Sequence, residues 1–212
     1  MNKFNQNYMK FLLRLHSYLY AKISYKSRKF NNNVHPKHRI MNYHQFFLDN
    51  INEESTVLDI GCGLGIVAYK IALKAKEVVA VDISKKSIQE AKRKFNRKNI
   101  EYIVADATKY DFDEVFDYIV LSNVLEHIQE RIPFLKKIKH LSNTLLIRVP
   151  MINRSWLVYY KKEMGIDYRL DSTHYIEYTI PSFKNEIESA GLKIKSYDIQ
   201  FGEIWAQVTL ND

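Results

Sequence analysis

The chain of 212 residues contains few of the residues that cross-link or interrupt a fold. It has one cysteine, four prolines and six glycines. A single cysteine cannot form an internal disulfide, which argues against a secreted, disulfide-stabilised protein. The low proline and glycine content argues against long disordered segments, and a hydrophobic fraction of 46% is enough to build a core. We therefore expect one globular domain with at most one appendage.

Long apolar segments are absent as well. No window holds about 18 uninterrupted apolar residues, so we expect no transmembrane helix. The N-terminus lacks an apolar stretch followed by small residues at a cleavage site, so we expect no signal peptide. These absences predict a cytoplasmic protein.

Acidic residues are nearly absent from residues 1–50. This segment has nine Lys or Arg and one acid, Asp49, whereas residues 51–212 have 23 basic and 23 acidic residues. The net charge of +8 therefore belongs to the N-terminal segment. Apolar residues fall on one stripe of a helix predicted over 6–25, and a second helix is predicted over 36–50.

This basic, aromatic segment has three interpretations. It is typical of a helical cap over the cleft of the following domain, and we define residues 1–50 as that cap. A basic amphipathic helix also suits peripheral contact of residues 1–30 with an anionic membrane. Basic residues interleaved with aromatic ones bind RNA in other proteins. All three interpretations stay open from the sequence.

Short β-rich segments alternate with helical ones from residue 55 onward. The predicted strands are Thr56–Ile60, Glu77–Val81, Ile100–Val104, Phe116–Leu121, Thr144–Val149, Leu192–Ile199 and Glu203–Leu210. Helices are predicted at about 65–75, 84–97 and 125–141, and a short one beginning near Pro181. This alternation is typical of a parallel α/β sheet, and the tight turn before the last strand predicts an antiparallel final pair.

A glycine-rich loop follows the first predicted strand. Residues 59–65 begin with Asp59 and have glycines at 61, 63 and 65, which let the backbone turn sharply and approach a ligand. In dinucleotide-binding folds the third glycine comes three residues after the second, but here it comes two after. A carboxylate at this position repels a negatively charged pyrophosphate, whereas it can stabilise the positive charges of a zwitterionic amino acid that carries a sulfonium. The loop therefore favours S-adenosylmethionine over NAD.

The loop resembles motif I of class I S-adenosylmethionine-dependent methyltransferases, and the similarity extends over about residues 55–150. Asp82 matches the ribose-binding acid of this family, and Asp106 with Ala107 matches the pair that contacts adenine. The resemblance implies a Rossmann-like α/β fold with a seven-stranded, mostly parallel sheet, helices on both faces and a C-terminal antiparallel hairpin. The residues expected to bind S-adenosylmethionine are Asp59, Gly61, Cys62, Gly63, Gly65, Asp82, Ile83, Asp106, Ala107, Ser122 and Asn123.

Catalytic candidates lie after the fourth strand and in the segment 151–179, which breaks the α/β alternation. We expect this segment to be an acceptor-binding lid within the methyltransferase domain of residues 51–212. His174 is the first candidate for the base or acceptor contact, His127 is the second, and Asp171 is expected to orient His174. The sequence around Glu126 and His127, with the later His174, is similar to small-molecule, quinone and polysaccharide O-methyltransferases.

A metal is the alternative role for these side chains. Some methyltransferases with a Glu-x-x-Glu-His motif and a later histidine hold a divalent ion. Here Asn123 stands at the position of the first acid, ahead of Glu126 and His127, which removes a charged ligand. We therefore expect no metal.

The acceptor is expected to be a small or glycan-like molecule, methylated at oxygen. Aromatic side chains with hydroxyl tips gather in the lid, as in sites for sugars and ring compounds. Glu203 and Trp205 are expected to close the same pocket. RNA is the less favoured acceptor, because residues 122–125 lack the two prolines typical of adenine-N6 methylation and Cys62 belongs to the glycine loop. A module that binds the cofactor without catalysis is the other alternative.

Overall fold

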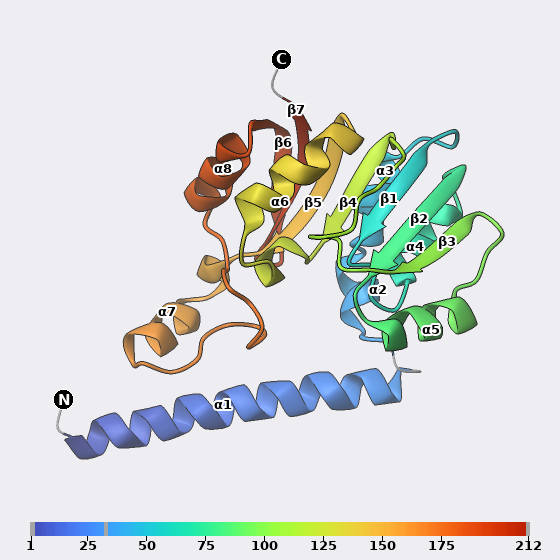
Figure 1. The fold of residues 1–212 in the computed structure, drawn as a ribbon. Helices are drawn as coiled ribbons and strands as arrows, with labels where there is room; N and C mark the ends of the chain where they lie inside the picture. Colours follow the sequence, from blue (N-terminus) through green and yellow to red (C-terminus); the bar gives the residue numbers. More distant parts are fainter. Residues whose placement is uncertain (1–2, 32–33, 211–212) are drawn as a thin grey trace.

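The computed structural model describes residues 3–31 and 34–210, and seven strands form one sheet (Figure 1). The sheet order is β3-β2-β1-β4-β5-β7-β6. The strands are β1 (Thr56–Ile60), β2 (Glu77–Asp82), β3 (Ile100–Val104), β4 (Tyr118–Ser122), β5 (Thr144–Pro150), β6 (Leu192–Gln200) and β7 (Glu203–Leu210). All neighbours are parallel except β7, which is antiparallel to β5 and β6. The predicted fold class is confirmed.

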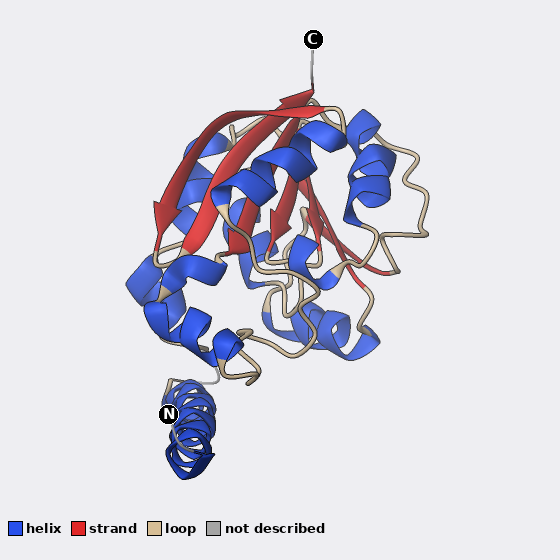
Figure 2. Cartoon of the chain, turned by 90° about the vertical axis from the view of Figure 1, so that its left-hand side faces the viewer, coloured by secondary structure: helices blue, strands red, loops and turns tan. Residues whose placement is uncertain are grey.

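Helices cover both faces of the sheet (Figures 1 and 2). One face packs against α6 (Arg131–Ile138) and α8 (Ile180–Ser189), and the other against α3 (His44–Asn50), α4 (Ile66–Ala72) and α5 (Lys85–Lys94). Side chains of one strand alternate between the two layers: Leu58 points to the first and Val57 to the second. Both are fully buried, as expected for parallel strands covered on both sides.

The prediction of one continuous helix over 125–141 is wrong. The segment divides into η1 (Leu125–His127), α6 and η2 (Lys139–Leu141). Pro133 lies in the first turn of α6, where its missing N–H has no helical partner to lose. The helix therefore begins only at residue 131, and the residues ahead of it form a loop that begins at the carboxyl end of β4.

The N-terminal segment forms three helices, α1 (Lys3–Phe30), α2 (Lys37–Met41) and α3. The single helix predicted over 36–50 is interrupted at Asn42, which takes a left-handed conformation with φ 44°. Helix α1 lies at the same end of the sheet as the carboxyl ends of the parallel strands (Figures 1 and 2). Among the described residues, no helix is long and apolar enough to cross a membrane.

The segment 151–179 contains more regular structure than the sequence predicted. It begins with η3 (Ile152–Arg154) and α7 (Trp156–Glu163), and then runs without regular structure to a bridge between Met151 and Tyr178. Arg154 fixes the segment by donating to the backbone oxygens of Met151 and Tyr168, each at 2.8 Å, and by pairing with Glu177. The aromatic composition hid the short helix because it has no clear 3.6-residue period.

Candidate active site

A cleft of about 870 Å³ opens at the carboxyl ends of the central strands. Strand order reverses between β1 and β4, and ligands of open α/β sheets bind at this switch point. The cleft is lined by the loops that follow β1, β2, β3 and β4, with Asp82 and Asp106 on one side and Asn123 and His127 on the other. A smaller pocket of about 240 Å³ shares Gly61 and Asn123 with it.

The predicted cofactor residues gather around these two cavities. Gly61, Asp82, Ile83, Asp106, Ala107 and Asn123 line the cleft, and Asp59, Cys62, Ser122, Gly61 and Asn123 line the smaller pocket. Gly63 and Gly65 line neither and shape the loop instead. Gly61 has φ +70°, and a Cβ there would lie 2.6 Å from Val124 Cγ2. Glycine at position 61 therefore permits both the turn and the close packing on the loop after β4.

Asp82 joins the end of β2 to the glycine loop. Its Oδ2 accepts a hydrogen bond from the Gly63 N–H at 2.8 Å, and its Oδ1 accepts one from the Ser84 N–H at 2.8 Å. Each carboxylate oxygen has a second lone pair, which stays available for a ribose hydroxyl in the cleft. Asp82 thus positions the glycine loop as well as lining the predicted ribose site.

Asp106 has a different local environment. Its Oδ1 accepts from the N–H and the hydroxyl of Thr108, at 3.0 and 2.6 Å. The hydrogen bond from the Thr108 hydroxyl is the main cause that lowers the pKa of Asp106. This carboxylate is therefore fixed and charged at the end of the cleft where the resemblance expects the adenine.

Asp59 is a buried carboxylate with an unsatisfied oxygen. Its side chain lies in β1 at the wall of the smaller pocket, and its Oδ2 has no hydrogen-bond partner among the described residues. Burial, with the nearby charge of Asp82, raises the pKa of Asp59 to about 8. A buried acceptor without a partner is costly, so the site favours a ligand that brings a cation or an N–H donor.

Because of this raised pKa, we expect the affinity for S-adenosylmethionine to increase with pH between 6 and 8. Below pH 8 the empty site holds Asp59 protonated. A cationic ligand then has to displace the proton, which weakens its binding by at most about tenfold per pH unit. Calorimetric titrations at pH 6, 7 and 8 measure the effect. The Asp59→Asn variant, which cannot ionise, should show a flat profile, and an equally steep profile in that variant would contradict this role.

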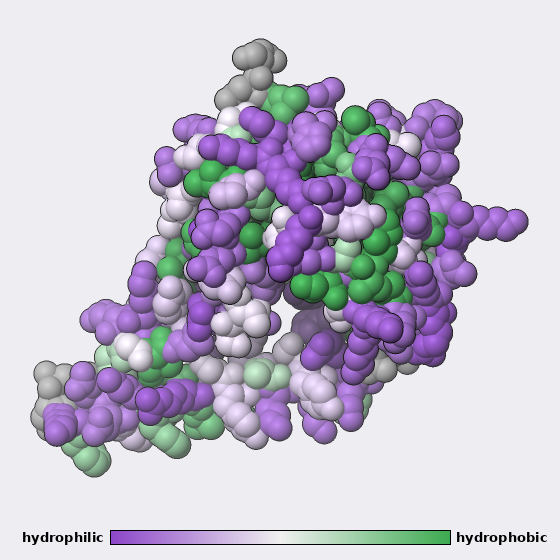
Figure 3. Space-filling view, viewed as in Figure 1, coloured by the Kyte–Doolittle hydropathy of each residue, from purple (hydrophilic) through white to green (hydrophobic). Residues whose placement is uncertain are grey.

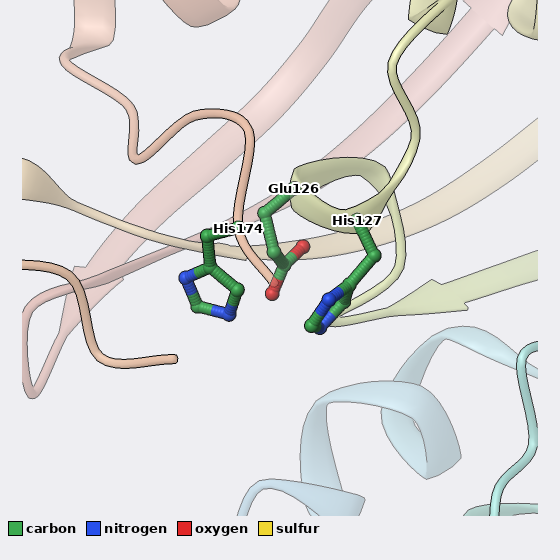
Figure 4. Close-up of side chains that lie close together, drawn as sticks. All are labelled: Glu126, His127 and His174. Atoms are coloured by element: carbon green, nitrogen blue, oxygen red, sulfur yellow. The ribbon is translucent and has the colours of Figure 1, made fainter. Parts of the chain in front are cut away.

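Three chemically active side chains converge beside the cleft (Figure 4). Glu126 and His127 come from η1 after β4, and His174 comes from the irregular segment after α7. One nitrogen or oxygen atom of each lies within 4.8 Å of the others. Glu126 and His174 are buried, whereas His127 is exposed and lines the cleft. Of the two histidines, His127 therefore lines the cleft and His174 does not.

The two histidines are held by different acids. His174 Nδ1 lies 3.2 Å from Glu177 Oε1, so Glu177 takes the position that was predicted for Asp171. Asp171 instead accepts from the Thr173 hydroxyl at 2.8 Å, and that hydroxyl lies 2.9 Å from His127 Nδ1. Asp171 therefore acts on His127 through Thr173. The role of Glu177 had no signal in the sequence, because it depends on how the irregular segment folds back.

In the neutral form of each ring, this arrangement leaves Nε2 as the nitrogen without a proton. Each Nδ1 faces an acceptor, which favours the tautomer with the proton on Nδ1. Glu126 Oε1 accepts from the Asn123 amide at 2.8 Å, and Oε2 has no partner among the described residues. Burial raises the pKa of Glu126 to about 7. Two imidazole lone pairs and a carboxylate thus meet with no donor between them, so the cluster binds a proton, a cation or a donor from a ligand.

The smaller pocket has a basic wall. Lys37 and His38 of α2 and Arg148 of β5 line it together with Asp59. Burial and the neighbouring Arg148 lower the pKa of Lys37, and burial with His44 lowers the pKa of His38 to about 4. No role was predicted for Arg148, because a single arginine inside an apolar strand forms no motif. An anionic group, such as a carboxylate, fits this wall.

Several residues predicted near the acceptor do not line the cleft. Of the lid aromatics, Tyr175 lines it, whereas Tyr178 is buried with its hydroxyl 2.6 Å from Glu186 and Trp156 is 74% exposed. Glu203 and Trp205 line neither cavity. Both are buried around Arg148 at the edge of the small pocket, so their part in closing the acceptor site is not supported by the geometry.

Comparison with known proteins shows similarity to methyltransferases. Residues 57–143 match the family described as "Methyltransferase domain". The chain is 34% identical over 93 residues to a probable (S)-tetrahydroprotoberberine N-methyltransferase from Papaver bracteatum. The aligned region covers 42% of this chain and 26% of that protein. The chain is 29% identical over 106 residues to the ubiquinone biosynthesis O-methyltransferase of Rickettsia conorii, covering 49% and 37%. The chain thus spans well under half the length of these relatives.

Solved structures show the same fold. Magnesium protoporphyrin IX methyltransferase from Synechocystis PCC 6803, solved with bound S-adenosylhomocysteine, superposes with a TM-score of 0.65 at 17% identity, covering 82% of this chain and 83% of that one. A methyltransferase from Clostridium acetobutylicum gives 0.64 at 16% identity, covering 92% and 100%. Residues 57–143 therefore match a methyltransferase domain, and the chain has the fold of S-adenosylmethionine-dependent methyltransferases.

Proposed function

We propose that the chain transfers a methyl group from S-adenosylmethionine to a hydroxyl oxygen of a small-molecule or glycan-like acceptor. The observation that carries this proposal is His127, an imidazole at the wall of the cleft whose Nδ1 contacts Thr173 and whose Nε2 has no hydrogen-bond partner among the described residues. Burial and the nearby His174 lower the pKa of His127, so the ring is neutral at pH 7 and can accept a proton. The cleft is large enough for a cofactor with a small acceptor.

Different residues of the chain bind the cofactor, remove the proton and contact the acceptor in the proposed reaction. When bound, the cofactor supplies the activated methyl group. Asp82 and Asp59 hold its two ends, and Asn123, which lines both cavities, lies between them. His127 Nε2 takes the proton of the acceptor hydroxyl, and Thr173 with Asp171 orients the ring and stabilises the charge it gains. Tyr175 gives the acceptor an aromatic wall.

The experiment that tests the proposal is incubation of the chain and S-adenosylmethionine with matched panels of phenols, sugars and amines. Mass spectrometry then identifies the acceptor that gains a methyl group. We expect products among the hydroxylated compounds. Methylation of amines alone would overturn the oxygen assignment and leave the methyltransferase activity. The relatives include both N- and O-methyltransferases, so the amine panel is the necessary comparison.

We expect His127→Ala to reduce turnover of a hydroxyl acceptor by about a hundredfold or more, the usual contribution of a positioned base. Cofactor affinity should change little, because His127 is not among the residues assigned to the cofactor. Initial rates and calorimetry measure the two quantities. His140→Ala, which removes an exposed histidine of η2, is the matched control. Unchanged turnover in His127→Ala would remove the base from the proposed mechanism.

The same cluster fits a divalent cation, which the sequence did not lead us to expect. Glu126 Oε2 is an orphaned buried oxygen, and the free nitrogens of His127 and His174 lie near it. Asn123 and the two histidine partners would then hold the ligands in place, as residues around metal ligands do. A bound cation would lower the pKa of an acceptor hydroxyl. Two imidazoles and one carboxylate suit zinc or manganese better than magnesium.

If the cluster holds a cation, we expect Zn²⁺ or Mn²⁺ to raise the melting temperature of chelator-treated protein by several degrees, and Mg²⁺ to have little effect. A one-site ligand at about a hundred times its Kd adds about 2.7 kcal/mol of stability. Glu126→Gln should lose the shift, and Glu130→Gln, an acid elsewhere in the cleft wall, should keep it. An equal shift in both variants would assign the ion to another site and leave His127 with the base role alone.

A further inference from the structure

Helix α1 turns its apolar side away from the rest of the protein. The side toward the domain carries Leu13, the buried residue of the helix, and Ser17 and Ser24, which contact Lys161 and His35. Residues two positions from Leu13 lie about 200° around a helix, so Phe11 and Leu15 point the opposite way. A globular protein normally places its apolar stripe on the inside, and α1 has the reverse arrangement.

The outward stripe is long and continuous. Its members follow one another at spacings of three or four residues, which keeps them on one side of the helix. They are Phe4, Tyr8, Phe11, Leu15, Leu19 and Ile23, and their exposed fractions run from 39% for Leu15 to 78% for Phe4. Figure 3 shows apolar side chains on the edge of α1 that faces away from the domain. Contiguous exposed apolar surface of this kind marks an interaction site.

The charge of α1 has one sign. The helix contains seven lysines and arginines and no acidic residue. Lys22, Lys26 and Lys29 lie on the same side as the apolar stripe, toward its C-terminal end, and the ammonium groups of Lys22 and Lys29 lie 5.3 Å from the rings of Tyr18 and Tyr25. Tyrosine rings beside lysines, next to apolar side chains, are the composition of helices that lie in the interface of a bilayer.

We propose that α1 binds the surface of an anionic lipid bilayer, with its outward stripe in the acyl-chain boundary and Lys22, Lys26 and Lys29 at the lipid phosphates. A second copy of the chain fits this side poorly, because two such helices would bring like charges together. RNA would bind the lysines and leave the apolar stripe in water. A bilayer satisfies both sets of side chains at once. Since α1 lies at the carboxyl ends of the strands, binding holds the cleft near the membrane surface (Figure 1).

The test is co-sedimentation of the full chain with vesicles of phosphatidylcholine alone and of phosphatidylcholine with roughly one third phosphatidylglycerol. We expect partitioning at least about tenfold stronger on the anionic vesicles, weakening as salt is raised. The Phe11→Asp/Leu15→Asp variant and the Lys22→Glu/Lys26→Glu/Lys29→Glu variant should each lose at least about tenfold of this binding. Lys76→Glu/Lys92→Glu/Lys98→Glu makes the same charge change on exposed lysines outside α1 and should lose much less.

Circular dichroism and thermal melting of every variant confirm that the domain stays folded, independently of any methyl transfer. Equal binding to both vesicle types, or equal losses in the α1 and control lysine variants, would overturn the proposal. So would an α1-dependent shift to dimers in sedimentation velocity, or an α1-dependent gel shift with RNA, in the absence of vesicle binding. Failure of vesicle binding leaves the proposed methyltransferase function untouched, because that function depends on the cleft.

Discussion

We expect Asp82→Ala to weaken binding of S-adenosylhomocysteine by at least about a hundredfold, with the protein still folded. Two contributions add here. The variant loses the charge-assisted hydrogen bonds to the ribose diol, each worth about 1.5–3 kcal/mol. It also releases the N–H groups of Gly63 and Ser84, which Asp82 holds at 2.8 Å in the empty site, so the loop has to be ordered when the ligand binds.

Calorimetric titration measures this loss, with NAD as the comparison ligand. Asp111→Ala is the matched control, because Asp111 is an exposed carboxylate that pairs with Lys137 and lines neither cavity. The control should bind as the natural chain does. Micromolar-range binding that survives in Asp82→Ala would place the ribose elsewhere. Preference for NAD would overturn the interpretation of the glycine loop.

The second large effect concerns stability. We expect Glu203→Ala to reduce the free energy of unfolding by about 3–5 kcal/mol, because it leaves the Arg148 guanidinium buried without its partner. The two side chains are 3% and 9% exposed, and they form a two-point pair, with Nε–Oε2 at 2.5 Å and Nη2–Oε1 at 2.8 Å. The guanidinium also lies 3.9 Å from the ring of Tyr43, and that contact cannot replace a carboxylate.

Urea denaturation of the variant measures the loss. The double variant Arg148→Met/Glu203→Leu removes both charges and fills a similar volume, so we expect it to recover most of the stability. If Glu203→Ala is as stable as the natural chain, the ion pair is hydrated and does not contribute to the free energy of unfolding. If the double variant is as unstable as the single one, packing rather than charge explains the loss.

The sequence predicted most of the sheet and the end of the sheet at which the cleft opens. β1, β3 and β7 have the predicted limits, because buried strands bounded by turn residues give a strong local signal. Asp59 and Asp82 were predictable for the same reason: each lies on or at the end of such a strand, and the glycine loop marks the ligand side. These parts of the protein are specified by neighbours in the chain.

The acceptor side was less predictable, because it is built from distant segments. Glu177 supports His174 only after the segment following α7 folds back to η1, and Asp171 reaches His127 through Thr173. Arg148 of β5 reaches the small pocket while paired with Glu203 of β7, a partner 55 residues away. The hydrophobic periodicity of the sequence does not indicate such contacts. The direction of the apolar stripe on α1 was hidden for the same reason, since a helical pattern shows a stripe and not the side on which the domain lies.

The hydrogen bond between Asp82 and Gly63 also means that the two ends of the cofactor site do not act independently. In the proposed cofactor site, Asp82 lies at the nucleoside end of the cleft, and Gly63 belongs to the loop beside the pocket proposed for the amino-acid end. A nucleoside that fixes Asp82 also fixes this loop, so an amino-acid fragment that arrives second meets a site already ordered. Thermodynamic linkage makes the effect mutual: each half of the ligand raises the affinity for the other. A cleft of this kind favours the complete cofactor over either of its fragments. Binding measurements with one fragment alone would therefore underestimate the selectivity of the cleft.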